Sequence, residues 1–165
     1  MDQLRYPRGV GFDISRDILN GLPVVDSNSL AYISSQHALR CLKILDVVNA
    51  LRELHRVLKP GGVLRLYLPD LDKAIAAYQR GEWNHFWYAW DRDTIGGNFI
   101  TQILDYNYTH TLFTYEFAEE LLYKAEFNDV RRVAYRHTSS SYPEIVELDS
   151  REEESFYIEA SKEMS

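Results

Sequence analysis

Residues 45–72 read LDVVNALRELHRVLKPGGVLRLYLPDLD, and this stretch decides the fold. Apolar residues recur in its first half at helical spacing and are expected to form one apolar face, which consists of Leu45, Val48, Leu51, Leu54 and Leu58. Pro60 cannot continue a helix, and Gly61-Gly62 supply a turn that accepts positive φ. Residues 63–68 form a near-continuous apolar run that contains Arg65, which is typical of a strand buried on both faces. The stretch therefore predicts a helix over about 45–58 and a buried strand over 63–68, which is half of an α/β crossover unit.

The rest of the chain alternates between strand and helix signals. Further strands are expected over 10–12, 30–34, 130–136 and 156–160, and further helices ending near 79 and near 125. Asp70 or Asp72 can cap the first of these helices, and Thr114 can cap the second. Gly81 marks a helix stop. This alternation predicts a parallel sheet with helices on both faces.

The composition is that of one globular domain spanning residues 1–165. Hydrophobic residues make up 45% of the chain and the net charge is −7, which argues against a nucleic-acid partner. Cys41 is the only cysteine, and the five histidines show no metal-ligand spacing, so we expect no metal site. The sequence contains neither a signal peptide nor a long apolar span, so we expect a cytoplasmic protein with no membrane partner.

Short motifs follow one another along the chain, namely GVGFD at 9–13, LPVVDSNS at 22–29, SQHAL at 35–39, RVLKPGG at 56–62, YLPDL at 67–71 and HTLFTYEFAEELLYKAEF at 110–127. In this order they resemble the class I S-adenosylmethionine-dependent methyltransferases, of a type 11-like group. The resemblance covers the chain and implies a Rossmann-like α/β sheet with helices on both faces and an antiparallel closing strand. It also implies S-adenosylmethionine as the cofactor, which itself carries the reactive methyl group.

The resemblance assigns cofactor contacts to residues in the first part of the chain. Asp13 would end the second strand of the family sheet and bind the ribose hydroxyls. Asp17 and Ile18 would bind the adenine amino group and its face, while Ser35 and Gln36 would touch the methionine part. Each polar residue also has a purely structural alternative. Asp13 could be a carboxylate that caps a loop, and Asp17 could be a solvated loop aspartate. Ser35 or Gln36 could be a polar helix N-cap.

Two histidines and an aromatic stretch are the candidates for the acceptor side of the reaction. His37 and His110 could each accept a proton from an oxygen or nitrogen acceptor, or could be packed or surface residues without a catalytic role. An aromatic-rich insertion over about 82–109 lies where the family binds acceptors. Aromatic walls suit a flat or sugar-like acceptor, here a small molecule or a glycan. The residues expected to line the acceptor site are Trp83, Trp87, Tyr106 and Tyr108, although helical spacing in this stretch also fits core or subunit contacts.

The sequence departs from the family pattern at its N-terminal end. The family places a glycine-rich cofactor loop after its first, central strand, and nothing before Asp13 matches that loop. We expect an N-terminally truncated sheet. The place of the missing first strand could be filled in two ways, by direct pairing of 10–13 with 30–34 or by a second copy of the chain in a homodimer. It could also stay open, in which case the cofactor site is lost. Alternatively, the chain is a fragment of a complete enzyme.

Two smaller departures concern single positions of the family motifs. Leu39-Arg40-Cys41 exchanges the family's acid and histidine for a cation and a thiol. Glu126 replaces a glycine at a helix end that favours positive φ. Two functions remain open: a methyltransferase, or a non-catalytic protein of the same fold that acts as a binding or assembly partner.

Overall fold

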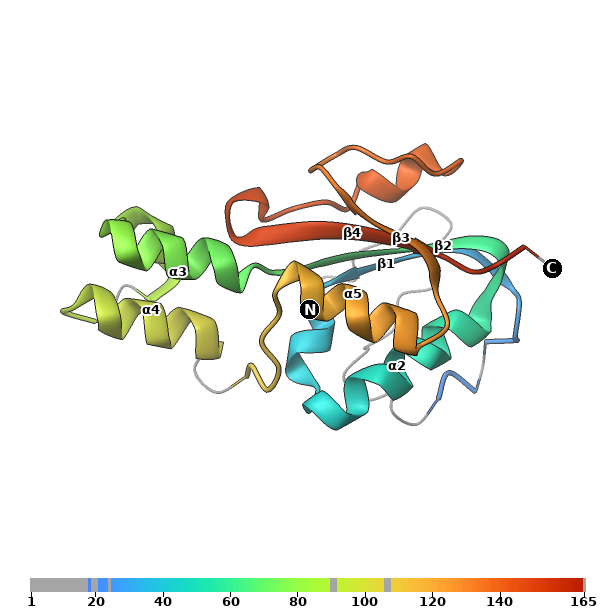
Figure 1. Ribbon diagram of the computed structural model, residues 1–165, viewed down its shortest axis with the longest axis horizontal. Helices are drawn as coiled ribbons and strands as arrows, with labels where there is room; N and C mark the ends of the chain where they lie inside the picture. The colour runs from blue at the N-terminus through green and yellow to red at the C-terminus, as the bar shows by residue number, and fades with distance from the viewer. Residues whose placement is uncertain (1–17, 19–20, 24, 90–91, 106–107, 165) are drawn as a thin grey trace, which may run out of the picture.

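The part of the chain that the structure describes is built around one four-stranded sheet, shown in Figure 1. A computed structural model describes residues 18, 21–23, 25–89, 92–105 and 108–164. The strands are β1 (Leu30–Gln36), β2 (Leu58–Pro69), β3 (Asn128–Val133) and β4 (Ser155–Ser161), in the order β1-β2-β4-β3. The pair β1/β2 is parallel, and β4 is antiparallel to both of its neighbours. The predicted α/β sheet with an antiparallel closing strand is therefore confirmed.

The helices form two groups around this sheet. The helical elements are α2 (Ile44–Val57), α3 (Leu71–Arg80), α4 (Ile95–Leu104), α5 (Tyr115–Lys124) and the 3₁₀ segments η1 (Ala38–Cys41), η2 (Trp83–Ala89), η4 (Pro143–Val146) and η5 (Glu152–Glu154). Helices α2 and α5 cover one face of the sheet, and the segment containing η4 lies over the other (Figure 1). Helices α3 and α4 pack together beyond the carboxyl end of β2. Every described helix is too short or too polar to cross a lipid bilayer.

The helix before the KPGG turn buries only part of the apolar face that was predicted, because Leu51, Leu54 and Leu58 are buried and Leu45 is not. Leu45 is 85% exposed, whereas the buried positions of α2 are Val47, Ala50, Leu51, Leu54 and Val57. The reason is geometric: a series with a step of three residues drifts by about 60° per step in a helix with 3.6 residues per turn. Leu45 therefore lies on the side of the helix opposite Leu54. The prediction that Leu45 belongs to the buried face was wrong.

The KPGG turn itself is part of the long strand β2 rather than a separate connection. The helix ends at Val57, and Leu58 already pairs with Leu30 of β1. Gly61 has a φ of +72°, as the turn prediction requires. The Gly61 N–H donates to the backbone oxygen of Lys162 at 2.9 Å, which ties the turn to the end of the chain.

Gly62 is required by close packing, and this gives a first testable prediction. A Cβ at this position would lie 2.8 Å from the backbone oxygen of Lys59 and 3.1 Å from that of Ala31. We expect Gly62→Ala to lower the free energy of unfolding by about 1–3 kcal/mol, measured by urea denaturation. Gly96→Ala is the matched control, because no atom lies within 3.4 Å of its added Cβ and alanine favours a helix. Equal stability of the two variants would contradict this account.

The two faces of the central strands carry different chemistry. On the side of α2 and α5 lie paired apolar residues of β2 and β4, namely Leu64, Leu66, Leu68, Phe156, Ile158 and Ala160. On the other side Arg65 is fully buried, as the near-continuous apolar run around it predicts. Its Nε donates to Oδ1 of Asp149 at 2.8 Å and its Nη1 to Oε1 of Glu159 at 2.7 Å. Arg65 thus ties the segment 134–150 to the sheet.

The expected helix ends are found at the predicted residues. Asp70 caps α3 by accepting a hydrogen bond from the Lys73 N–H at 3.2 Å, and Thr114 caps α5 in the same way. Gly81 ends α3 with a φ of +72°. Glu126 has a φ of +71°, which confirms that a non-glycine residue occupies a left-handed position at this helix end.

Strand β1 lies at one edge of the sheet that the described residues form. Its only partner among them is β2. The predicted strand over 10–12, with Asp13 and Asp17, lies outside the described residues. The absence of the family's first strand therefore stays a prediction.

Candidate functional site

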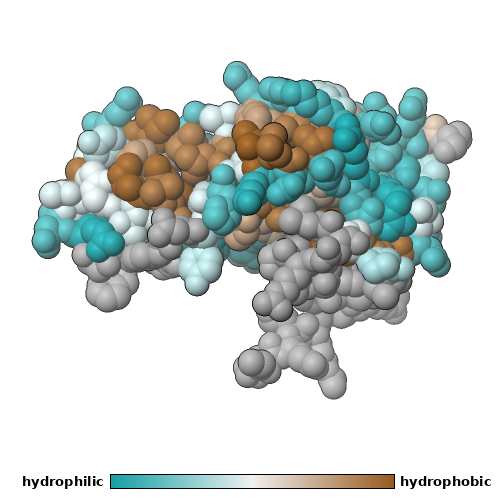
Figure 2. Space-filling view, turned by 90° about the horizontal axis from the view of Figure 1, so that it is seen from below, coloured by the Kyte–Doolittle hydropathy of each residue, from teal (hydrophilic) through white to brown (hydrophobic). Residues whose placement is uncertain are grey.

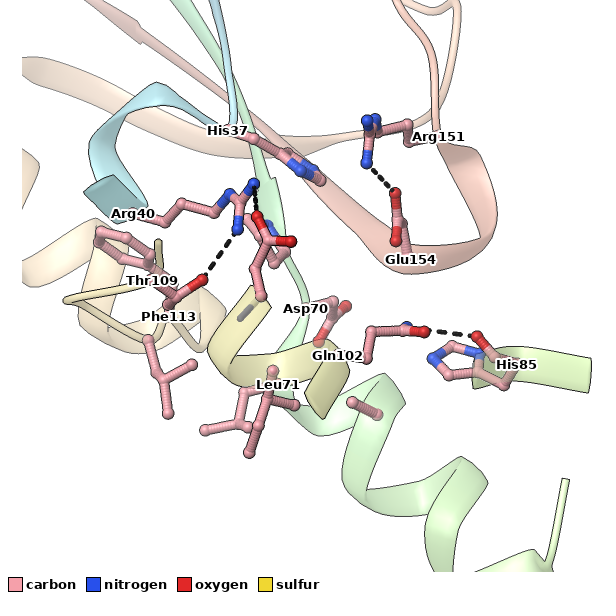
Figure 3. A pocket seen from close by; sticks show the side chains of 15 residues that line it. His37, Arg40, Asp70, Leu71, His85, Gln102, Thr109, Phe113, Arg151 and Glu154 are labelled. Carbon is pink, nitrogen blue, oxygen red and sulfur yellow. Dashed lines mark hydrogen bonds and ion pairs between the residues drawn. The ribbon is translucent and has the colours of Figure 1, made fainter. Parts of the chain in front are cut away.

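A pocket opens where the carboxyl ends of β1 and β2 meet (Figure 3). Its volume is about 80 Å³. Segments distant in the sequence contribute to it: the turn after β1, the start of α3, the end of α4 and the region before β4. The residues that line it are His37, Arg40, Pro69, Asp70, Leu71, Ala74, His85, Gln102, Ile103, Asp105, Thr109, Leu112, Phe113, Arg151 and Glu154. Ligands of open α/β sheets bind at this edge, so the pocket is the candidate functional site.

Arg40 is held in the pocket wall by three different contacts. Its guanidinium forms an ion pair with Asp105, the residue that ends α4 with a φ of +43°. Its Nη1 donates to the Thr109 hydroxyl at 2.8 Å, as a dashed line marks in Figure 3. Its backbone oxygen accepts from the His110 N–H at 2.7 Å. Arg40, the cation that replaces the acidic residue of the family motif, therefore has an acidic partner in this chain, Asp105.

His37 occupies a strained and buried position beside Arg40. It follows β1 with a φ of +47° and is 8% exposed. Its Nε2 lies 2.8 Å from the Ser155 hydroxyl. Burial, and then the positive charges of Arg151 and Arg40, lower the pKa of His37 to about 3. At neutral pH the ring is therefore uncharged and acts as a hydrogen-bonding group and a weak base.

The formal charges that line the pocket are all balanced by partners. Arg40 pairs with Asp105. Arg151 pairs with Glu154 at 2.8 Å, and Asp70 contacts the guanidinium of Arg132 at 3.2 Å. The pocket therefore has no charged side chain without an oppositely charged neighbour among the described residues.

Several polar atoms of the pocket, in contrast, have no hydrogen-bond partner among the residues that the structure describes. The buried atoms without one are Arg40 Nε, His85 Nε2, Gln102 Oε1 and Asp105 Oδ1. The other end of the Gln102 amide is fixed, because its Nε2 donates to the backbone oxygen of His85 at 3.2 Å. A buried polar atom without a partner costs about 1–3 kcal/mol, so these atoms indicate a place for a polar ligand or for water.

The described residues among those predicted to bind the cofactor do not line this pocket. Ser35 is 2% exposed near the end of β1, and the exposed Gln36 donates to the Ser150 hydroxyl at 2.7 Å. Ile18 is 2% exposed and belongs to the main hydrophobic core. Asp13 and Asp17 are outside the described residues.

The residues predicted for catalysis and acceptor binding are only partly brought together. His37 lines the pocket; His110 is exposed and is not among the lining residues. Trp83 is 49% exposed in η2 and Tyr108 is 69% exposed, and neither lines the pocket. Trp87 lies in η2, and Tyr106 is outside the described residues.

Sequence reasoning missed the side chains that surround His37, namely Arg40, His85, Gln102, Asp105 and Arg151. In the sequence, only Arg40 was marked, because it departs from the family motif. The other four residues lie in the aromatic-rich insertion and in the segment before β4, where no motif marks them. The described residues contain no group of three or more His, Cys, Asp or Glu side chains arranged to hold a metal ion.

Comparisons with known proteins support the assignment of the fold. Residues 8–66 match the family model of a methyltransferase domain, and no curated protein matches the chain. A "SAM-dependent methyltransferase, possible histamine N-methyltransferase" from Thermotoga maritima is 18% identical, with a TM-score of 0.52 over 88% of this chain and 61% of that one. A SAM-dependent methyltransferase from Archaeoglobus fulgidus is 11% identical, with a TM-score of 0.53 over 88% and 65%.

A third solved structure, described as a possible exported protein from Bordetella parapertussis, is 16% identical, with a TM-score of 0.55 over 90% of this chain and 43% of that one. The chain thus spans between 43% and 65% of the length of these three structures. At such identities the likeness shows the fold, which confirms the architecture predicted from the motifs.

Proposed function

We infer that this chain, a member of the class I methyltransferase group by its fold and by its matched domain, is an S-adenosylmethionine-dependent methyltransferase whose acceptor is a small molecule or a glycan. The observation that carries the proposal is the pocket at the carboxyl ends of β1 and β2, with buried polar atoms that lack partners. Open α/β sheets bind their ligands at this edge. The acceptor would enter the pocket beside His37.

The pocket suits an acceptor group and not a whole nucleoside cofactor. Its volume of about 80 Å³ is well below the roughly 300–1,000 Å³ of sites for drug-sized ligands. Ser35 and Gln36, at the end of β1, would hold the methionine part of the cofactor, and Asp13 and Asp17 its nucleoside. Ile18 is buried in the main hydrophobic core, so its side chain is not available to the adenine face. When bound, the cofactor supplies a methyl group activated on a sulfonium sulfur.

Within this proposal the chain's own residues bind and orient the acceptor. His37 is favoured over His110 because it lines the pocket. With a pKa of about 3, its neutral ring can accept a hydrogen bond from the acceptor but does not keep a second, transferred proton at neutral pH. The proton released from an acceptor hydroxyl would therefore pass to water. The ion pair of Arg40 with Asp105 would keep the pocket wall rigid.

A non-catalytic binding or assembly role is the second candidate, and specific observations favour it. The low pKa of His37 makes this residue a poor general base. On the side of the molecule seen in Figure 2, hydrophobic side chains gather in patches between polar ones. Exposed apolar residues of α2 and α4 are Ile44, Leu45, Ile100 and Leu104. Such surfaces are typical of interaction sites, and a second copy that pairs with β1 is the partner expected from the sequence.

Calorimetric titration of the full chain with S-adenosylhomocysteine, the demethylated product, separates the two candidates. The enzyme proposal expects saturable binding that Asp13→Ala abolishes. Asp26→Ala is the matched control, because this aspartate is exposed in the loop before β1 and has no assigned cofactor contact. Equal binding by both variants would contradict the assigned cofactor site. Light scattering on the same samples measures the mass of the particle, and a strict monomer would contradict the homodimer.

A further inference from the structure

We propose that the pocket beside His37 binds a neutral ligand that carries several hydroxyl groups, with a single sugar ring as the fitting size. The binding of this ligand is argued from the pocket alone; its role as the methyl acceptor rests on the proposed function. Three features of the pocket favour such a ligand: its balance of charge, the kind of polar atoms without partners among the described residues, and the shape of its wall.

The charge balance of the pocket excludes a strongly charged ligand. Asp105 and Arg40 form an ion pair in which the side chains are 10% and 18% exposed. Arg151 is neutralised by Glu154, and Asp70 by Arg132. A ligand with a net charge would have to give up its hydration without gaining an unpaired counter-charge, which is unfavourable in a largely buried site.

The polar atoms without partners point to hydroxyl groups. Gln102 Oε1 and Asp105 Oδ1 both require a hydrogen-bond donor, whereas Arg40 Nε requires an acceptor. An ammonium group could only donate hydrogen bonds to the two oxygens, and a carboxylate or phosphate could only accept one from Arg40 Nε. A hydroxyl group donates and accepts at the same time, so a ligand with several hydroxyls can satisfy all of these atoms.

The shape of the wall fits one ring. The volume of about 80 Å³ corresponds to roughly five to eight water-sized spheres, which is too little for an oligosaccharide. Leu71 and Leu112, which is 37% exposed, supply apolar surface for the carbon–hydrogen face of a ring. Figure 3 shows polar side chains of His37, Arg40 and Gln102 arranged around the same space.

Ligand-observed saturation-transfer NMR tests the proposal with methyl glycosides of glucose, galactose and mannose. The charged probes are methyl glucuronoside, which is anionic, and methyl 6-amino-6-deoxyglucoside, which is cationic. We expect at least one neutral glycoside to bind with a Kd in the millimolar range and the charged probes to bind at least about tenfold more weakly. Failure of every neutral glycoside to bind, or tighter binding of a charged probe, would overturn the proposal.

Two variants in the pocket and one control variant keep this test specific to the pocket. Gln102→Leu should weaken binding of the neutral glycoside about tenfold, because the buried hydrogen bond to Oε1 is lost. Gln79→Leu, on the exposed side of α3, should leave binding unchanged. Asp105→Asn removes the partner charge of Arg40, so it should allow the glucuronoside to bind. If Gln102→Leu binds like the wild type, or Asp105→Asn still rejects the glucuronoside, the assigned contacts are wrong.

The outcome separates this inference from the proposed function. Binding of a neutral glycoside by a chain that does not bind S-adenosylhomocysteine would support the sugar site and contradict the methyltransferase. Binding of S-adenosylhomocysteine without binding of any glycoside would contradict only the sugar site.

Discussion

Replacing Arg65 with leucine should lower the free energy of unfolding by about 3–5 kcal/mol, because it leaves two buried carboxylates without their counter-charge. Asp149 is fully buried and receives two hydrogen bonds from the guanidinium, at 2.8 and 2.5 Å. The Glu159 side chain, 4% exposed, receives a third. The guanidinium also donates to the backbone oxygens of Ala134 and His137, at 3.2 and 3.0 Å. The variant would therefore detach the segment 134–150 as well as weaken the sheet.

Urea denaturation followed by circular dichroism measures this effect. Arg131→Leu is the matched control, because this arginine pairs with Asp129 at the surface, where ion pairs contribute little. We expect the midpoint for Arg131→Leu to stay close to the wild-type value. A change of less than about 1 kcal/mol for Arg65→Leu would mean that the buried network does not hold the two parts together.

The second large effect is a dependence of stability on pH that originates at His37. In the unfolded chain this residue titrates near 6.5, whereas its pKa in the folded protein is lowered to about 3. Between these values the unfolded state binds a proton that the folded state does not. The stabilisation is therefore complete above pH 6.5 and is lost as the pH falls toward 3. Between the two pKa values the free energy of unfolding falls by up to about 1.4 kcal/mol for each unit by which the pH decreases.

Comparison of the wild type with His37→Gln isolates this contribution from that of the carboxylates. Glutamine does not titrate, so the variant should lose about 2 kcal/mol less stability than the wild type between pH 6.5 and 4.5. Denaturation at pH 8, where both side chains are neutral, supplies the reference. Parallel pH profiles for the two proteins would contradict the burial of an uncharged ring.

Features that depend on neighbouring residues were predictable from the sequence. The turn at Gly61, the caps at Asp70 and Thr114 and the positive φ at Glu126 each follow from local backbone chemistry. The motif order was enough to predict the sheet and its antiparallel closing strand. The buried face of α2 was misassigned at Leu45 because an apolar series with a step of three residues drifts around a helix.

Features that depend on distant residues were not predictable. The sequence places Arg65 inside an apolar run, but its partners Asp149 and Glu159 lie 84 and 94 residues further along. The same holds for the pocket, where His37 meets Ser155 across 118 residues. No pattern in one sequence links such positions, because the fold alone brings them together.

Whether the chain binds the cofactor is tested most directly by the heat measured when the 165 residues are titrated with S-adenosylhomocysteine. We expect a saturable signal with one site per chain, from a cofactor bound at the end of β1 next to the His37 pocket. A titration that stays flat at millimolar ligand would contradict it and would leave the binding or assembly role as the function of this fold.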